Sequence, residues 1–211
     1  MGRTITIGRE FGSGGRELGR RLAEALHYEY YDKEILREIA EHTSLSEEYV
    51  RQVVERTPHH LYPITTGHSL SYVNDYTFRQ VQSVYQAQSE IIRDMASRSD
   101  CVIVGRCAGY ILCDRNPFRV FVYADLDSRV RRCLLRMPET EHMTEKQLRR
   151  HILKIDRERA RYYNFYTDQK WGDKRYYDLC INTTDTDIRD IIPSLARLFA
   201  EEHPVEQTKS E

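Results

Sequence analysis

A glycine-rich stretch near the N-terminus, GREFGSGGRE, joins an alternating apolar run to an amphipathic segment, and its residue types suit phosphate binding. Glycine lets backbone N–H groups approach an anion closely, and the first turn of a following helix attracts negative charge. The usual phosphate-binding signature is G-x-x-x-x-G-K-[ST], in which the Lys reaches the terminal phosphates and the hydroxyl contacts Mg²⁺. The loop from Gly8 to Arg16 therefore predicts a phosphate site, although it contains no Lys.

The signature can be laid on the chain in two registers, and neither is complete. With Arg16 in the place of the Lys, Gly15 precedes it as required, but glutamates stand at the first glycine and at the hydroxyl position. One residue earlier Gly14 fits, while Arg9, Gly15 and Arg16 stand in the other three places. Sequence alone leaves both registers open.

Charged residues and glycines also follow the other apolar runs, and ligands of open parallel sheets collect beyond the carboxyl ends of the strands. These positions are Asp32 and Lys33, Gly105 and Arg106, and Asp125 and Asp127. Asp156 and Arg159 lie three residues apart in a helical segment and so share a face. Singly, the loop could be a tight connection, Arg106 a surface arginine, and Asp156 with Arg159 a surface ion pair. Together at one sheet edge, the arginines favour a polyphosphate site, because guanidinium binds phosphate oxygens bidentately.

Short apolar runs alternate with helical segments, which is typical of a doubly wound α/β domain with a parallel sheet. Strands are expected in TITIGR, HYEYYD, CVIVGR, FRVFVYAD and YDLCIN. Ser46 is placed as the N-cap of a short helix, a long helix is expected over 78–99, and a last helix over 187–202. Two charged helices flank a break near Pro138. The segment 57–77 has two prolines and no steady period, and is predicted to be a mobile insert over a site.

Composition excludes several classes of protein. The 211 residues suit one domain, and 32 Lys and Arg against 33 Asp and Glu give a net charge of −1, with no general attraction to nucleic acid or membrane. No apolar stretch resembles a signal peptide or a membrane span. The five cysteines show no C-x-x-C pair, which favours reduced thiols. We expect a cytoplasmic protein that binds neither a nucleic-acid polymer nor a membrane.

Five stretches occur in a characteristic order: ITIGREFGSGGRELGRRLAEAL, YYDKEIL, VIVGRCAGYIL, KIDRERARYYNFYTDQKWGD and YYDLCINT. Together they resemble the cytidylate kinase-like family, a branch of the P-loop nucleoside monophosphate kinases. The resemblance implies a three-layer α/β/α fold with a five-stranded parallel sheet and helical inserts. It implies a single domain over 1–203, with a monophosphate-binding insert at roughly 33–98, a lid at roughly 137–160 and a flexible tail over 204–211. The segments Pro58 to Tyr76 and Pro138 to Thr144 would then close on the monophosphate and on ATP.

The resemblance also implies a reaction: transfer of the γ-phosphoryl group of ATP, with Mg²⁺, to a nucleoside monophosphate, CMP or dCMP, by a monomer or homodimer. Arg106 matches the Arg of a DGRD motif that holds the monophosphate, and Asp156 with Arg159 matches a D-x-x-R pair that holds sugar and phosphates. The residues implied to bind ATP are Gly8, Arg9, Gly12, Ser13, Gly14, Gly15, Arg16 and Glu17. Those implied for the acceptor are Asp32, Arg37, Arg106, Asp156 and Arg159, and those for catalysis Arg16, Arg106 and Arg159.

The chain departs from the family pattern at three points. Arg16 is the nearest substitute for the absent Lys, with Arg9 as its rival. The hydroxyl for Mg²⁺ must come from Ser13, from water or not at all. Cys107 stands where DGRD has its second Asp, so cytosine specificity is in question. Two alternatives therefore stay open: a P-loop kinase for another small acceptor, and a nucleotide-binding regulatory module without turnover.

Overall fold

The structure is a computed structural model and describes residues 3–55, 75–137 and 143–200. Most of the predicted mobile insert, most of the segment from Pro138 to Thr144, and the predicted tail lie outside these residues.

A parallel sheet of five strands forms the centre, as the apolar runs predict. The strands are β1 (Thr4–Arg9), β2 (Glu29–Tyr31), β3 (Cys101–Val104), β4 (Phe118–Tyr123) and β5 (Leu179–Asn182). Their order in the sheet is β2-β3-β1-β4-β5, with Ile5 of β1 paired with Val102 on one side and with Phe118 on the other. All four residues of β3 are buried, in keeping with a strand covered on both faces.

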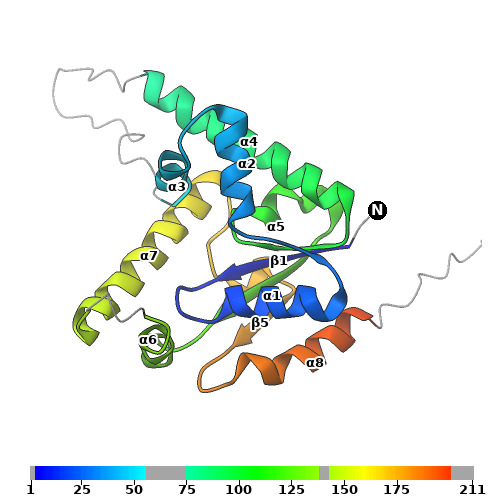
Figure 1. Ribbon diagram of the computed structural model, residues 1–211, viewed down its shortest axis with the longest axis vertical. Coiled ribbons are helices and arrows are strands. Elements are labelled where there is room, and N and C mark those ends of the chain that lie inside the picture. Colours follow the sequence, from blue (N-terminus) through cyan, green and yellow to red (C-terminus); the bar gives the residue numbers. More distant parts are fainter. Residues whose placement is uncertain (1–2, 56–74, 138–142, 201–211) are drawn as a thin grey trace, which may run out of the picture.

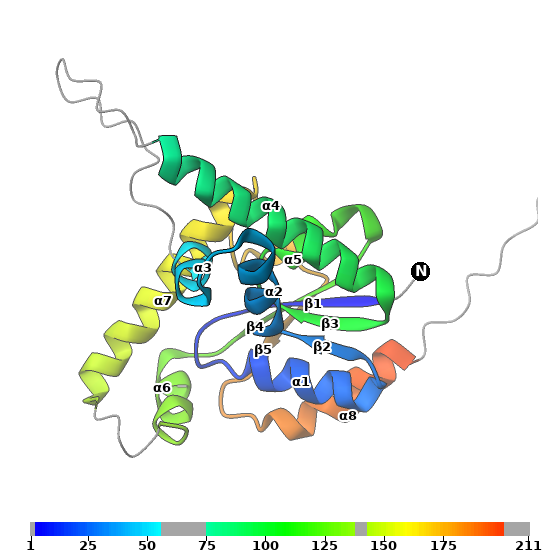
Figure 2. The same cartoon turned by 45° about the horizontal axis from the view of Figure 1, so that its top comes forward.

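Helices cover both faces of the sheet and one end. They are α1 (Gly15–Leu26), α2 (Glu34–Thr43), α3 (Glu47–Glu55), α4 (Asp75–Arg98), α5 (Ala108–Ile111), α6 (Leu126–Leu134), α7 (Glu145–Tyr166) and α8 (Ile188–Ala200), with short 3₁₀ turns η1 (Cys113–Arg115) and η2 (Lys174–Tyr176). Figure 1 shows α1 and α8 on one face, with α2, α4 and α5 on the other. The fold is therefore a three-layer α/β structure. Figure 2 shows that α6 and α7 lie at one end of the strands.

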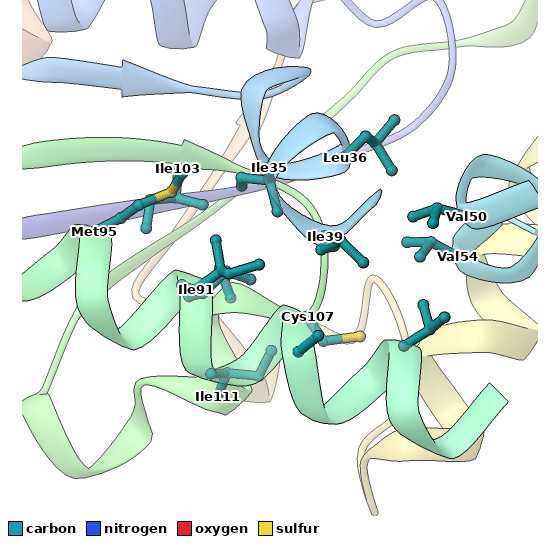
Figure 3. Packing of buried hydrophobic residues seen from close by; sticks show 14 of the residues in the cluster. Ile35, Leu36, Ile39, Val50, Val54, Ile91, Met95, Ile103, Cys107 and Ile111 are labelled. Carbon is teal, nitrogen blue, oxygen red and sulfur yellow. The ribbon is translucent and has the colours of Figure 1, made fainter. Parts of the chain in front are cut away.

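Apolar side chains fill both interfaces between sheet and helices. On one face, Leu18 and Leu22 of α1 and Leu195 of α8 pack against the sheet. On the other, α2, α3, α4 and α5 enclose a second cluster, which includes Ile39, Ile103 and the residues drawn in Figure 3. This second cluster reaches the chain just beyond β3, so it supports one side of the candidate site.

Capping residues define several helix starts. The N–H of Tyr49 donates to Ser46 Oγ at 3.2 Å, which confirms the predicted N-cap of α3. Thr144 and Gln147 form a capping box at the start of α7. The long helix α4 begins at Asp75, three residues before the predicted start at 78.

The strand order creates a crevice at the carboxyl ends of β1 and β3. From β1 the chain crosses to β2, beyond β3, whereas from β3 it crosses to β4, on the far side of β1. The two connections therefore diverge at the point where ligands bind in open α/β sheets. Figure 1 shows the arrowhead of β1 directed toward α6 and α7, which lie beyond this edge.

Candidate functional site

The loop between β1 and α1 requires its glycines. Gly12 and Gly14 have φ angles of +77° and +84°, in the left-handed region. A Cβ atom at Gly14 would lie 2.8 Å from Cδ1 of Ile188, so the loop is also packed too closely for a side chain there. No side chain caps α1 at Gly14. The free N–H groups and the positive end of the helix dipole at the start of α1 therefore face the loop, where they attract anions.

Arg9 ends β1 and extends over the crevice. Its side chain is 12 % exposed, and its Nη2 lies 3.9 Å from Asp32 Oδ1. Burial lowers the pKa of Arg9 well below its ordinary value, and the positive charges of Arg159 and Arg106 lower it further. The three arginines thus share a poorly solvated region of positive potential, which favours an anionic ligand.

Asp32 follows β2, as predicted, and joins two arginines. Its side chain is 4 % exposed, and Arg16 Nε lies 2.5 Å from its Oδ2. The Arg16 side chain is 57 % exposed and reaches across to Asp32 from the first turn of α1. Asp32 therefore holds Arg16 beside the loop and partly balances the charge of Arg9.

Arg106 lies on a strained segment after β3. Gly105, Arg106 and Cys107 have consecutive φ angles of +79°, +57° and +55°. Left-handed backbone at two successive residues other than glycine is costly, and such strain tends to occur at functional sites. The buried side chain of Gln88 on α4 donates from Nε2 to the Arg106 carbonyl at 3.1 Å and accepts from the Tyr162 hydroxyl at 3.3 Å. Gln88 therefore ties α4 and α7 to the strained turn.

Asp156 and Arg159 on α7 both contact the glycine-rich segment between β1 and α1, which we call the phosphate loop after its predicted role, but in different ways. The Asp156 carboxylate accepts from the Phe11 N–H at 2.7 Å and from Arg129 Nη1 at 2.5 Å. Arg159 Nη1 donates to the Arg9 carbonyl at 3.2 Å and lies 4.0 Å from Asp156 Oδ1. Asp156 thus anchors the loop to α6 and α7, and both of its oxygens have protein partners.

Other predicted site residues lie away from the crevice or are engaged elsewhere. Ser13 is fully buried and its hydroxyl donates to the Glu10 carbonyl at 2.9 Å, so the structure does not present it to a metal ion. Glu17 pairs with Arg21 and Arg136. Arg37 is exposed on α2 and does not line the two cavities described below. Gly8 lies against Phe121 and lines the cavity beyond β3, not the cavity along the loop that the predicted role in ATP binding would require.

The two acidic residues after β4 have structural roles. Asp125 is the N-cap of α6, where it accepts from the Ser128 N–H at 2.6 Å. Asp127 forms an ion pair with Arg149 of α7. Neither lines either of the two cavities at the crevice, although both follow a strand at the ligand-binding edge.

Two cavities meet at the crevice and share Arg9 and Arg159. The first, which we call the donor cavity, lies along the phosphate loop and also has Arg132, Arg136 and His151 in its walls. The second, the acceptor cavity, lies between the carboxyl end of β3 and α7. Its wall contains the following residues: Gly105, Arg106, Cys107, Arg119, Tyr162, Tyr163, Trp171 and Tyr177. The two shared arginines therefore lie where the two cavities adjoin.

The described residues offer little to a metal ion by themselves. Among them no group of three or more His, Cys, Asp or Glu could hold one. Mg²⁺ bound with a nucleotide takes most ligands from phosphate and water and uses one or two carboxylates. Asp32 has a buried Oδ1 without a hydrogen-bond partner, but that atom lies 3.9 Å from Arg9 Nη2 and Asp32 lines neither cavity, so most ligands of a bound Mg²⁺ would have to come from phosphate and water.

Sequence reasoning missed Gln88, Arg129 and the tyrosines of the acceptor cavity. Gln88 is a polar residue among the apolar positions of a long helix, and this was the local signal that could have indicated it. Its burial is seen only in the structure. Arg129 occurs in a basic helix and looks like its neighbours, yet its side chain is 6 % exposed.

Within the described ranges, no helix is both long and apolar enough to span a membrane.

Known proteins resemble this chain over most of its length. A cytidylate kinase from Haloarcula marismortui is 25 % identical over 190 residues, 89 % of this chain and 84 % of that protein. An uncharacterized protein from Eubacterium ventriosum has a similar structure, with a TM-score of 0.67 and 29 % identity over 95 % of this chain and 99 % of that one. Shikimate kinase from Bacteroides thetaiotaomicron shares the fold, with a TM-score of 0.55 at 17 % identity over 94 % and 98 % of the two chains. The family model of the cytidylate kinase-like family matches residues 4–185, and the chain belongs to that family.

Proposed function

We propose that this protein transfers the γ-phosphoryl group of ATP to a nucleoside monophosphate, with CMP or dCMP as the acceptor. Family membership and fold support a kinase that handles nucleotides. The observation that carries the proposal is that two cavities, one along a glycine loop and one lined by aromatic residues and arginines, share Arg9 and Arg159. A phosphoryl group moving between them stays in contact with guanidinium groups throughout.

On the donor side, the loop and the start of α1 would hold the phosphates of ATP. Arg132 contributes to this loop directly, since its Nη1 donates to the Gly12 carbonyl at 2.9 Å and its Nη2 to the Thr183 carbonyl at 3.0 Å. Mg²⁺ would neutralise phosphate charge there, with most of its ligands supplied by phosphate and water.

On the acceptor side, Arg106 and Arg159 would hold the phosphate of the monophosphate. One of its oxygens forms the new P–O bond to the γ-phosphorus, the bond between that phosphorus and the β-bridging oxygen breaks, and ADP leaves. Phosphoryl transfer depends mainly on alignment and charge neutralisation. The arginines can supply both, and no general base is assigned.

A second candidate, transfer to a smaller acceptor, is favoured by the acceptor cavity itself. Its free volume is about 80 Å³, and no described Asp or Glu lines it. Ligand pockets usually measure about 300–1,000 Å³. A carboxylate would be the natural partner of the cytosine amino group, and the buried thiol of Cys107 is a poor replacement. Admission of CMP therefore requires the aromatic walls to move apart.

The test is an assay of ADP formation with ATP and a panel of nucleoside monophosphates, against ATP alone. We expect CMP or dCMP to give the largest kcat/KM. Arg106→Ala and Arg106→Lys should each lower it by about 10²–10³, because an ammonium group does not reproduce the guanidinium fork. Arg20→Ala is the matched control, since Arg20 is exposed on α1 and pairs with Glu24. ATP binding without transfer to any monophosphate would refute the proposal.

A further inference from the structure

Residues 9 and 15 compete for the same space. A Cβ atom at Gly15 would lie 2.6 Å from Cβ of Arg9 and 3.2 Å from its Cγ. Carbon atoms in favourable contact are about 3.5–4.0 Å apart. With this backbone, a side chain at position 9 therefore excludes one at position 15, and the reverse.

The phosphate-binding signature places its own pair at these two positions. In the register where Gly14 fits, the first glycine of the signature falls on residue 9 and its Lys on residue 15. Here position 9 carries a cation and position 15 is glycine, so the cation and the glycine have exchanged places relative to the signature. In either arrangement one cationic side chain occupies the space between the end of the strand and the start of the helix.

The path of the Arg9 side chain leads to the junction of the two cavities. A Cβ atom at Gly105 would lie 1.6 Å from Arg9 Nη1, so the guanidinium crosses directly over that glycine. Arg9 lines both the donor and the acceptor cavity. Arg16 differs: it lines the donor cavity, is 57 % exposed, and its Nε is occupied by Asp32.

We propose that Arg9 is the catalytic cation that replaces the lysine of the phosphate loop, and that its side chain requires glycine at position 15 and, together with the φ of +79°, at position 105. This inference rests on the proposed function and assigns the role to Arg9 in place of Arg16. The guanidinium presents a planar fork, so it can contact oxygens of the donor and of the transferred group together, whereas an ammonium is a compact point charge.

The first test removes the charge and keeps the volume. Arg9→Met should lower kcat by about 10²–10³ and weaken ATP binding by about tenfold or more, with a smaller effect on ADP, measured by calorimetry. Arg16→Ala should have a smaller effect on both quantities. Arg20→Ala should behave like the wild type, because its side chain is exposed and faces neither cavity.

The second test reverses the exchange. Gly15→Lys should lower the unfolding temperature and weaken ATP binding, because the Lys collides with Arg9. Arg9→Gly should weaken ATP binding through loss of the cation. The double variant Arg9→Gly/Gly15→Lys restores the usual arrangement, and should bind ATP about tenfold or more tightly than Arg9→Gly alone.

The measurements of ATP binding test the role of Arg9 even if no monophosphate is phosphorylated. Failure of this inference can therefore be distinguished from failure of the proposed function. It is overturned if Arg9→Met keeps ATP affinity and kcat within about twofold, a change of about 0.4 kcal/mol. It is equally overturned if Arg16→Ala alone causes the loss, or if the folded double variant binds ATP no better than Arg9→Gly.

Discussion

Replacement of Asp156 by Ala should destabilise the protein and loosen the phosphate loop together. The Asp156 side chain is 12 % exposed and that of its partner Arg129 is 6 % exposed. Removal of one partner from a buried ion pair costs about 3–5 kcal/mol, because the remaining charge stays buried. Glu10 Oε2 lies 3.5 Å from Arg129 Nη1 and partly compensates, so we expect the lower end, about 3 kcal/mol.

The assay is equilibrium unfolding in urea, followed by calorimetry with ATP. For a chain of this size, a loss of about 3 kcal/mol corresponds to a decrease in Tm of about 6–12 °C. The Phe11 N–H also loses its acceptor, so the affinity for ATP should fall. Arg129→Met/Asp156→Leu should recover most of the stability, because no unpaired charge remains.

A result within about 0.5 kcal/mol of the wild type for Asp156→Ala would refute this reasoning, since that is the range of ordinary surface substitutions. Unchanged stability, together with a loss of activity that depends on the acceptor's sugar, would instead support the role in sugar binding that the family resemblance implies. The two readings of Asp156 are therefore separated by the unfolding measurement together with an assay in which the sugar of the acceptor is varied.

Two further predictions concern groups outside the crevice. Burial raises the pKa of Asp178, but hydrogen bonds from the side chain and backbone N–H of Arg119 outweigh it, and the net pKa is lowered. The stabilisation is therefore present above the unfolded pKa of about 3.9 and is lost as pH falls through the folded value, so the deficit of Asp178→Asn at neutral pH should shrink in acid. That deficit should be at most about 1 kcal/mol in urea unfolding, because the pair is partly screened by solvent, and a pH-independent deficit would contradict the assignment. Burial raises the pKa of Cys107 to about 12, whereas Cys113 is exposed. Maleimide labelling of the native protein at pH 8, read by mass spectrometry, should modify Cys113 and spare Cys107 until denaturant is added; early labelling of Cys107 would show that its cavity opens.

Periodicity and turn chemistry allowed much of the architecture to be predicted. The buried strands, the helix after the glycine loop and the N-cap at Ser46 depend on residues close together in the chain, so the sequence contains their signal. The ordered motifs likewise indicated the family, and the alternation of strands and helices placed Asp32 and Arg106 at one edge of the sheet.

Tertiary packing decided what each side chain does at that edge. The two registers of the loop look equivalent in sequence, and our choice of Arg9 over Arg16 rests on the close approach of Arg9 to Gly15, its passage over Gly105 and its place in both cavities. Asp156 looks like the partner of Arg159 three residues away, but its buried partner is Arg129, 27 residues earlier. Which charge meets which depends on where separate helices converge. Local spacing determines the elements, whereas burial and charge pairing arise from non-local contacts that no single stretch contains.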